Sequence, residues 1–274
     1  MSGTLYIVST PIGNLKDITL RALDILRQSD YIIAESSART SKLLNEYQIR
    51  QKIITFNKDN EKKKLSLILK DLKDGATVSL VSDAGTPVIS DPGFEIIKNY
   101  DSINIIPIPG PSSLTAAVSI SKIPMNNFMF LGFLSKKSKE RRGQLQYIQF
   151  CYLPTIIFES KHRINSLVKE VIDILGPEAN ISIMRELTKM HEEVLFGTAE
   201  KLLSKLRVNP IAGEITMIIN PVKPNNQKFH IFDSQIIELS KKYSIGEVVN
   251  IIRLFNDLNK KELYKYVLSI RQKS

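Results

Sequence analysis

Three loops rich in glycine, proline and hydroxyl residues are the parts of this sequence best suited to chemistry. They read "STPIGNL" (9–15), "SDAGTPVISDPG" (82–93) and "PIPGPSS" (107–113). Glycine lets the backbone approach a ligand closely, and proline holds a loop in shape without a backbone donor. One such loop would suggest only a tight turn. Three of them, each after an apolar run, indicate a binding crevice.

The usual phosphate-binding motifs are missing from these loops. The chain contains no GxxxxGK[ST] sequence, and "TPIGNL" does not supply the GxGxxG of a dinucleotide fold. The kinase and hydrolase signatures are also absent. A neutral or zwitterionic adenosyl ligand, held by backbone groups and apolar walls, remains open.

The first half alternates strand-like and helical patterns. Apolar runs predict strands at 4–10, 31–36, 53–56, 77–83 and 103–110. Helical patterns lie between them at 17–26, with Asp17 as N-cap, near 40–47 and at 59–73. This alternation predicts an α/β fold with a parallel or mostly parallel sheet covered by helices on both faces. The three loops would then meet at the carboxyl ends of the strands.

The second half predicts another α/β unit followed by a helical extension. Strands are expected at 128–134, 155–160, 181–187 and 214–220, and helices near 140–149, 161–174 and 198–206. Boundaries are indicated by "SKIPMNN" near 120–126 and by "NPVKPNNQK" at 220–228. Ser244 and Glu247 form a capping box before one helix, and 260–270 reads as another. The expected division is 1–120, 121–222 and 232–274.

Positive charge is concentrated in two segments. "KKSKERR" (136–142) has five basic residues and one acidic residue, and 221–274 has ten basic and five acidic residues. Together they hold nine of the ten excess positive charges of the chain. Clustered basic charge is typical of proteins that bind a polyanion such as nucleic acid. A generally lysine-rich composition explains the charge equally well.

Cysteine and histidine usage argues against a disulfide or a metal. Cys151 is the single cysteine, and the three histidines (His162, His191 and His230) are far apart. "HEEVL" at 191–195 is not the HExxH zinc pattern. The N-terminus does not read as a signal peptide, and no run of 18 apolar residues predicts a membrane span. We expect a cytoplasmic protein without a metal.

Seven motifs in order resemble those of the small-subunit ribosomal RNA ribose 2′-O-methyltransferases of the tetrapyrrole methylase superfamily. They are "LYIVSTPIGNLKDIT", "SLVSDAGTPVISDPG", "IPIPGPSSLTAA", "FLGFLSKKSKERR", "IFESKHR", "MRELTK" and "GE" at 213–214. No single motif is decisive, but their order is specific. The similarity runs from about residue 4 to the C-terminus and includes "KKELYKYVL" at 260–268.

The resemblance implies a fold, a cofactor and a substrate. Two α/β domains of tetrapyrrole methylase type would hold S-adenosylmethionine in the cleft between them, followed by a short helical extension, in a homodimer. The acceptor would be the ribose 2′-hydroxyl of a cytidine in the decoding centre of 16S ribosomal RNA, presented as free RNA or as the 30S subunit. The implied cofactor shell is Ile12, Asp83, Ala84, Gly85, Thr86, Val88, Ser112, Ser113, Leu187 and Gly213.

One loop departs from the pattern of the family. After the Ala-Glu pair that ends the second strand, an acidic residue, Thr and Arg are expected. Here "AESSART" keeps Glu35, but Ser36 and Ser37 replace the acid and Thr. Ala38 occupies the position of the Arg, and Arg39 is displaced by one residue. The departure leaves the role of this loop toward substrate open.

Catalytic and RNA-binding candidates follow from position and charge. Glu35 is the first candidate for base or orienting group, and an ion pair with Arg39 is the alternative. Arg185, which alternation would place beside Leu187 and opposite Glu186, could hold a phosphate or form an Arg–Glu bridge at the dimer interface. The expected RNA-contacting cations, splayed outward from a helix starting near Ser138 and from the C-terminal extension, are Lys136, Lys137, Lys139, Arg141, Arg142, Lys260 and Lys261.

Two other classes of function remain as alternatives. A methylase of small tetrapyrroles would share the fold, but the basic segments and the "GTPVISDPG" loop count against it. A nucleic-acid-binding protein without enzymatic activity could use 244–270 as a helix-turn-helix, but this leaves the three loops unexplained. A thermal shift with S-adenosylmethionine would separate a binder from a methylase.

Overall fold

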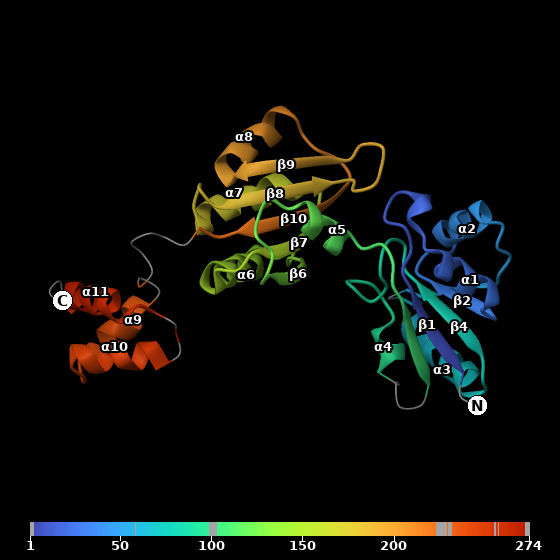
Figure 1. The fold of residues 1–274 in the computed structure, drawn as a ribbon, viewed down its shortest axis with the longest axis horizontal. Coiled ribbons are helices and arrows are strands. Elements are labelled where there is room, and N and C mark those ends of the chain that lie inside the picture. The colour runs from blue at the N-terminus through green and yellow to red at the C-terminus, as the bar shows by residue number, and fades with distance from the viewer. Residues whose placement is uncertain are drawn as a thin grey trace.

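The computed structural model describes residues 3–57, 59–98, 103–222, 229, 232–254, 256 and 258–271. Figure 1 shows two α/β bodies joined near α5, and a helical unit that stands apart at the C-terminal end. The boundary predicted at 220–228 lies mostly outside the described residues, because 223–228 are not among them.

The first body is built on a five-stranded sheet whose strands are all parallel. In sheet order they are β3 (Ile53–Thr55), β2 (Tyr31–Ala34), β4 (Thr77–Val81), β1 (Thr4–Val8) and β5 (Asn104–Ile108). The parallel sheet predicted from the alternating pattern is confirmed. Because every strand runs in the same direction, the loops after β1, β2, β4 and β5 gather at one edge.

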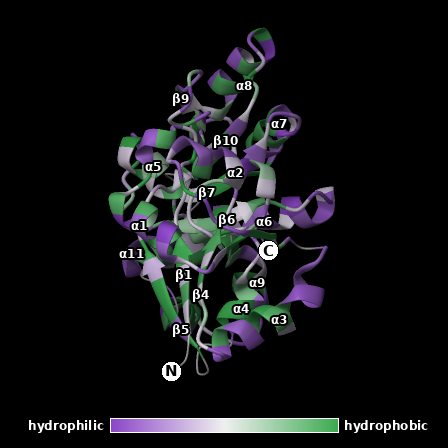
Figure 2. Cartoon of the chain, turned by 90° about the vertical axis from the view of Figure 1, so that its right-hand side faces the viewer, coloured by the Kyte–Doolittle hydropathy of each residue, from purple (hydrophilic) through white to green (hydrophobic). Residues whose placement is uncertain are grey.

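Helices cover both faces of this sheet. On one face α1 (Leu20–Gln28) and α2 (Ser37–Glu46) bury residues such as Leu26 and Leu43. On the other face α3 (Glu61–Lys73) and the short α4 (Phe94–Ile97) bury Leu72 and Ile96. Figure 2 shows hydrophobic strands surrounded by helices with hydrophilic outer faces, as expected for a sheet buried on both sides.

Two helix starts differ from the sequence-based prediction. Residues 15–17 form a short 3₁₀ turn, and α1 begins only at Leu20, where the Thr19 side chain accepts a hydrogen bond from the Ala22 backbone N–H. Asp17 is therefore not the N-cap of α1. Similarly, α2 begins at Ser37 rather than near 40, because Ser36 occupies its N-cap position. In both places a hydroxyl side chain satisfies a free helix-end donor.

The second body contains a mixed five-stranded sheet. In sheet order the strands are β6 (Met129–Phe133), β7 (Thr155–Ser160), β10 (Glu214–Asn220), β8 (Asn180–Arg185) and β9 (Glu193–Thr198). Only β6 and β7 pair in parallel. The face away from the first body packs on α6 (Ser138–Cys151), α7 (Ile164–Leu175) and α8 (Ala199–Val208). Strand β9 was not predicted; its sequence, "EVLFGT", follows the polar stretch "TKMHE" and carries a single short apolar run.

Helix α5 (Ser113–Ile120) belongs by its packing with the second sheet. Its buried Ala117 lies in one cluster with Ile156 of β7 and Ile218 of β10. The sequence-based division placed this helix in the first unit, before a boundary at 120. In the structure, the chain passes from the first body to the second earlier, between the end of β5 at Ile108 and the start of α5.

The C-terminal unit consists of α9 (Asp233–Ser240), α10 (Ile245–Leu254) and α11 (Lys260–Arg271). Val249, Leu263 and Val267 are part of its own apolar core. The predicted capping box is confirmed: the Glu247 carboxylate accepts from the Ser244 N–H at 2.8 Å, and the Ser244 hydroxyl accepts from the Glu247 N–H at 3.4 Å. Within the described residues, no helix combines the length and apolar composition needed to cross a membrane.

Candidate active site

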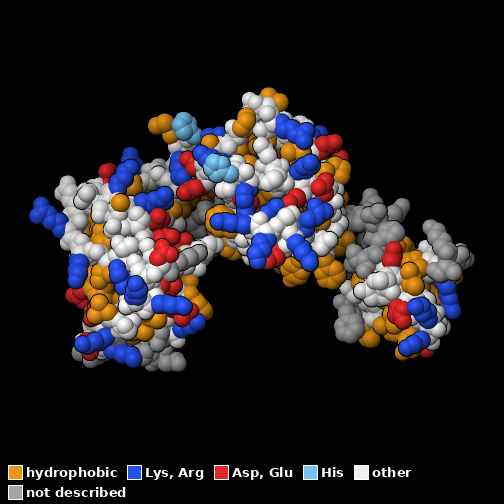
Figure 3. All heavy atoms as spheres, turned by 180° about the vertical axis from the view of Figure 1, so that it is seen from behind, with side chains coloured by type: hydrophobic (Ala, Val, Ile, Leu, Met, Phe, Trp, Pro, Cys, Tyr) orange, Lys and Arg blue, Asp and Glu red, His pale blue; other side chains and the backbone are white. Residues whose placement is uncertain are grey.

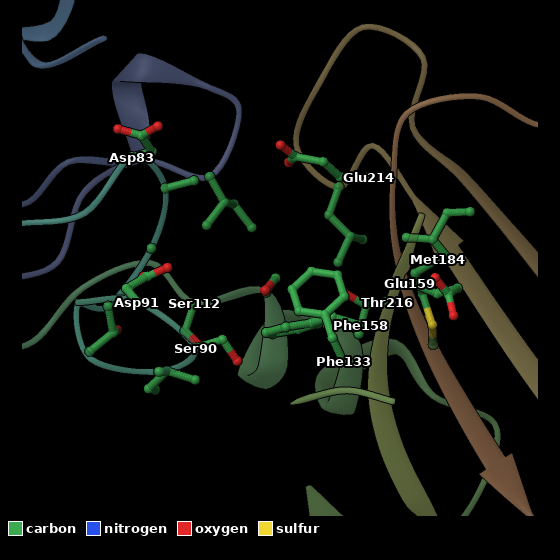
Figure 4. A pocket seen from close by; sticks show the side chains of 18 of the residues that line it. Asp83, Ser90, Asp91, Ser112, Phe133, Phe158, Glu159, Met184, Glu214 and Thr216 are labelled. Atoms are coloured by element: carbon green, nitrogen blue, oxygen red, sulfur yellow. The ribbon is translucent and has the colours of Figure 1, made fainter. Parts of the chain in front are cut away.

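A cleft of about 300 Å³ lies between the loops of the first sheet and the strand ends of the second. In Figure 4, Asp83, Asp91 and Ser112 face Met184, Glu214 and Thr216 across the cleft, with Phe133 and Phe158 between them. The volume is in the range of small-molecule sites. The lining residues are Ile12, Glu35, Arg39, Asp83, Ala84, Gly85, Thr86, Ile89, Ser90, Asp91, Ser112, Ser113, Phe133, Phe158, Glu159, Met184, Leu187, Glu214, Ile215 and Thr216.

The first wall of the cleft is held together by contacts between the three glycine-rich loops. Thr10 and Gly85 exchange two backbone hydrogen bonds, of 2.9 and 3.0 Å. The Ser9 and Thr86 hydroxyls lie 2.9 Å apart. A Cβ atom at Gly110 would lie 2.9 Å from the Ser9 Cβ, so this position requires glycine. The loops therefore form one preorganised surface.

The loop after β4 has a strained backbone. Gly85 has φ +84°, and Val88 and Ser90, which are not glycines, have φ of +73° and +70°. Left-handed conformations at such residues cost about 1–3 kcal/mol each and cluster at functional sites. This conformation turns Ile89 and Ser90 toward the cleft, while Val88 packs against the core below the sheet.

Asp83 presents a polar atom that lacks a protein partner. Its Oδ1 is buried without a hydrogen bond, whereas Oδ2 lies 3.5 Å from the Arg39 guanidinium. A buried acceptor without a donor is costly, and in native structures such atoms are uncommon and often belong to functional sites. Arg39, although displaced in the sequence, thus reaches the cleft and pairs with Asp83. The ion pair considered above between Arg39 and Glu35 is replaced by this one.

The second wall is formed by side chains from neighbouring strands of the second sheet. Leu187 follows β8, Ile215 lies on β10, Phe158 on β7 and Phe133 on β6. The register of β6 against β7 shifts between Phe130 and Gly132, and Gly132 has φ +59°. This irregularity, of the kind that redirects side chains in a strand, leaves Phe133 exposed in the cleft.

The two walls touch at the end near Leu187. A Cβ atom at Gly13 would lie 2.7 Å from the Thr188 hydroxyl and 2.9 Å from the Leu187 carbonyl oxygen. The Asn14 N–H donates to the Thr188 hydroxyl at 3.1 Å, and Ile12 packs in one apolar cluster with Leu187. Gly13 is thus needed for a close approach between the two bodies.

A charged network supports this contact. The Lys189 ammonium lies 2.9 Å from both the Glu186 and Glu214 carboxylates. Burial raises the pKa of Glu186, but the Glu214 N–H and the Lys189 ammonium lower that pKa more, so that it lies below its ordinary value. Burial lowers the pKa of Lys189, but the two carboxylates raise it above its ordinary value. Both groups are charged at neutral pH.

The lining is acidic although the protein is basic. Carboxylates come from Glu35, Asp83, Asp91, Glu159 and Glu214, whereas Arg39 is the single cation among the described lining residues. Arg163 neutralises Glu159 through hydrogen bonds of 2.8 and 2.7 Å. Lys189 and Arg39 likewise pair with Glu214 and Asp83. The five carboxylates still outnumber these three cations, and this excess favours a cationic ligand and disfavours a phosphate inside the cleft.

The structure brings most of the expected cofactor shell together. Among the lining residues are Ile12, Asp83, Ala84, Gly85, Thr86, Ser112, Ser113 and Leu187. Val88 and Gly213 do not line the cleft. Val88 packs into the core, and Gly213, with φ +98°, approaches the Glu186 carboxylate instead. Glu214 is the residue next to Gly213 that faces the cleft.

The two catalytic candidates have different positions. Glu35 lines the cleft, directly after β2. Arg185 does not: its guanidinium pairs with Glu193 of β9 at 3.2 Å. The expected alternation beyond Arg185 also fails, because the strand ends there and Glu186 and Thr188 adopt positive φ.

The basic segment at 136–142 contains two kinds of cation. Lys136, Lys137 and Lys139 are exposed, and Figure 3 shows Lys and Arg side chains gathered on the central body. Arg141 is not splayed outward, because its guanidinium donates to the Glu170 carboxylate at 2.7 and 2.6 Å. Arg142 is partly exposed, 3.9 Å from Asp173. Lys260 and Lys261 are exposed at the start of α11, in the separate C-terminal unit.

Several lining residues escaped the sequence analysis. Phe133, Phe158 and Met184 were read only as strand residues, and Ser90 and Asp91 only as part of a loop. The "SDPG" at the end of the second loop was their one local signal. Which strand residues face the cleft depends on the pairing of distant segments.

A family model described as "Tetrapyrrole (Corrin/Porphyrin) Methylases" matches residues 4–203. A ribosomal RNA small subunit methyltransferase I of Thermotoga maritima is 42% identical over 220 residues, covering 80% of this chain and 98% of that protein. One of the same name from Buchnera aphidicola subsp. Acyrthosiphon pisum is 39% identical over 274 residues, covering 97% and 96%.

Solved structures with the same fold are distant in sequence. A cobalt-precorrin-4 methyltransferase has a TM-score of 0.59 at 16% identity, covering 79% of this chain and 94% of that one. A diphthine synthase has a TM-score of 0.63 at 14% identity, covering 84% and 94%. At such identities the likeness concerns the fold alone.

Proposed function

This chain belongs to the tetrapyrrole methylase family, and from that premise we propose that it methylates the ribose 2′-hydroxyl of a cytidine in the decoding centre of 16S ribosomal RNA. The observation that carries this proposal is an acidic cleft close in sequence to an exposed basic segment. Phe133 lines the cleft, and Lys136, Lys137 and Lys139 follow within six residues. The relatives named as ribosomal RNA small subunit methyltransferases support the substrate class.

The methyltransferase activity, the fold and the family predicted from the seven motifs are confirmed by these comparisons. Methyltransferases of this family use S-adenosylmethionine, as the resemblance implied. The alternative of a nucleic-acid-binding protein without enzymatic activity is thereby set aside. A small-tetrapyrrole methylase would match the same family model. The relatives at 42% and 39% identity are named as ribosomal RNA methyltransferases, whereas the cobalt-precorrin-4 methyltransferase, at 16% identity, shares only the fold.

The residues of the cleft fit S-adenosylmethionine. Asp83 and Gly85 both line the cleft, and Asp83 Oδ1 lacks a protein donor. Ile12 and Leu187 supply an apolar wall. The sulfonium and ammonium groups of the ligand outweigh its single carboxylate, so its net positive charge suits the acidic lining. When bound, it supplies an electrophilic methyl group.

Glu35 is the residue that we assign to the acceptor hydroxyl. A ribose hydroxyl is a weak nucleophile, and a positioned carboxylate improves it by accepting its hydrogen bond and then its proton. Glu35 lies in the cleft at the carboxyl end of β2, on the same wall as Asp83. The remaining contribution of the protein is to align the hydroxyl with the methyl group, because an in-line transfer depends strongly on geometry. We assign Arg185 a structural role only, because its guanidinium pairs with Glu193 of β9.

The RNA backbone would be held outside the cleft. Phosphates are repelled by the acidic lining and attracted by Lys136, Lys137 and Lys139. Lys260 and Lys261 on the C-terminal unit provide a second, auxiliary contact. The match to the Thermotoga maritima protein leaves about a fifth of this chain unmatched, a length comparable to the part after β10. We also propose that the protein is a homodimer and lies in the cytoplasm, where ribosomal subunits are assembled.

Methyl transfer to defined substrates tests the proposal. Purified protein would be given labelled S-adenosylmethionine with deproteinised 16S RNA, with 30S particles, or with uroporphyrinogen as a tetrapyrrole control. We expect labelling of one cytidine ribose in the RNA or the particle, located by ribose-methylation mapping. Cofactor binding, seen as a thermal shift, without labelling of any RNA would refute the proposed substrate.

A further inference from the structure

Phe133 is an exposed aromatic side chain inside a cleft. It is 59% exposed, although it lies on a strand and next to two buried positions, Gly132 and Leu134. Its ring meets Phe158 edge-on, with centroids 5.7 Å apart at 61°, and Phe158 meets Phe130 in the same way at 5.1 Å and 68°. The Phe133 ring is therefore held against Phe158 while more than half of the residue remains exposed.

The order of the strands places Phe133 far from the cofactor end of the cleft. Leu187, at β8, contacts Ile12 and lies where the two walls meet. Phe133, at the edge strand β6, is separated from it by β10 and β7. The residues that fit the cofactor, Asp83 and Gly85, lie on the loop that also pairs with Thr10, toward the Ile12 end. The Phe133 end is left for the second substrate.

The surface charge changes from negative to positive next to Phe133. Inside the cleft the lining is acidic, whereas the three exposed lysines of 136–139 begin three residues after Phe133. A nucleotide of single-stranded RNA can satisfy both surfaces, with its phosphates at the lysines and its uncharged base in the cleft. On the opposite wall, Ile89 is the other exposed apolar side chain of the lining, 36% exposed.

We propose that Phe133 is the stacking platform for the base of the acceptor nucleotide. This assignment rests on the proposed function and adds a residue that positions the substrate. The ring would hold an unstacked base so that its ribose reaches Glu35 and the methyl donor. Removal of one base–aromatic stack typically weakens binding about 5- to 100-fold.

A single introduced tryptophan can report on this contact. The chain contains no tryptophan, so the tryptophan fluorescence of Phe133→Trp, excited selectively over tyrosine, comes from this position alone. We expect quenching by a single-stranded oligoribonucleotide that carries the decoding-centre cytidine. Phe150→Trp is the matched control, because Phe150 is 55% exposed and lies on α6 outside the lining. Quenching by S-adenosylhomocysteine alone would assign the platform to the cofactor adenine and overturn the proposal, as would no quenching by RNA.

Kinetics separate a platform from a merely structural ring. For Phe133→Ala we expect KM for the RNA substrate to rise about 5- to 100-fold, with unchanged cofactor affinity and unfolding midpoint. Phe133→Tyr should restore the KM, and Phe150→Ala should leave it unchanged. An unaltered KM in Phe133→Ala would overturn the proposal while leaving the proposed function intact. If the unmodified protein methylates no ribosomal RNA, the proposed function fails, and the fluorescence assay still decides whether Phe133 binds a base.

Discussion

The two walls of the cleft differ in which part of the chain faces the ligand. The first wall consists of loops such as 82–86, whose backbone is shaped by Gly85 and by hydrogen bonds to Thr10. The second wall consists of side chains from neighbouring strands, such as Phe158 and Thr216. A backbone wall suits a constant ligand, whereas side chains can be varied to suit different acceptors. Under the proposed function, the first wall would hold the cofactor and the second wall the acceptor.

Glu35 is the exception on the first wall, because its side chain is expected to do chemistry. Glu35→Gln should lower kcat by about two to four decades, the range for removal of a general base. The cofactor affinity should not change, since the amide keeps the shape of the side chain. Methyl transfer under single-turnover conditions measures the effect. Glu46→Gln, an exposed position at the end of α2, is the control, and near-normal turnover of Glu35→Gln would make Glu35 structural.

Gly85→Val tests the backbone character of the first wall. The new side chain would meet Ile12 Cγ2, which lies 3.3 Å from the Cβ position, at a φ of +84° that disfavours valine. We expect S-adenosylmethionine affinity to fall about 10- to 100-fold in calorimetry. Gly176→Val is a matched control, because Gly176 has φ +93° and open space around it, away from the cleft. It should lose stability without losing affinity; an equal drop in affinity in both variants would contradict the assignment.

Arg141→Met tests whether Arg141 stabilises the fold, in contrast to the exposed lysines beside it. The variant should lose about 2 kcal/mol of unfolding free energy at neutral pH, because two charged hydrogen bonds to Glu170 disappear. The hydrogen bond from Arg141 lowers the pKa of Glu170 below its ordinary value. The pair therefore stabilises the fold above the unfolded pKa of a glutamate, about 4.3, and this contribution is lost as pH falls through the lowered folded pKa. Urea unfolding at pH 7 and pH 3 should show the difference shrink; a constant difference would refute the electrostatic origin.

Replacing Lys136, Lys137 and Lys139 by alanine should have the smallest effect on a single affinity but a distinctive salt dependence. For every phosphate that the variant no longer neutralises, the slope of log K against log salt should fall by roughly 0.7 to 0.9. Affinity for S-adenosylmethionine should stay the same. Exchange of Lys201, Lys205 and Arg207 on α8 removes equal charge elsewhere and serves as control. Identical slopes in both triple variants would move the RNA contact to Lys260 and Lys261.

Local patterns in the sequence determined every strand except β9, and the loops that form most of the first wall. The run from Thr77 to Val81 followed by "SDAGTP" needs no distant partner to be recognised, because strand propensity and turn chemistry act over a few residues. The resemblance to the family, rather than the local pattern, implied Asp83, Gly85 and Ser112 as cofactor residues, and all three line the cleft. The motif order indicated the family, which the comparisons confirmed.

Only the tertiary structure decided how distant residues combine. Arg141 and Lys139 look alike in the sequence, yet Glu170, 29 residues beyond Arg141, buries one of them in an ion pair. Phe133 is exposed because the register of β6 on β7 shifts near Gly132, and α5 packs on β10 although it directly follows the first sheet. Arg39 meets Asp83 and Gly13 meets Thr188 across 44 and 175 residues respectively. Such pairings depend on long-range contacts whose free energy arises only when the whole fold is assembled, so no local pattern encodes them.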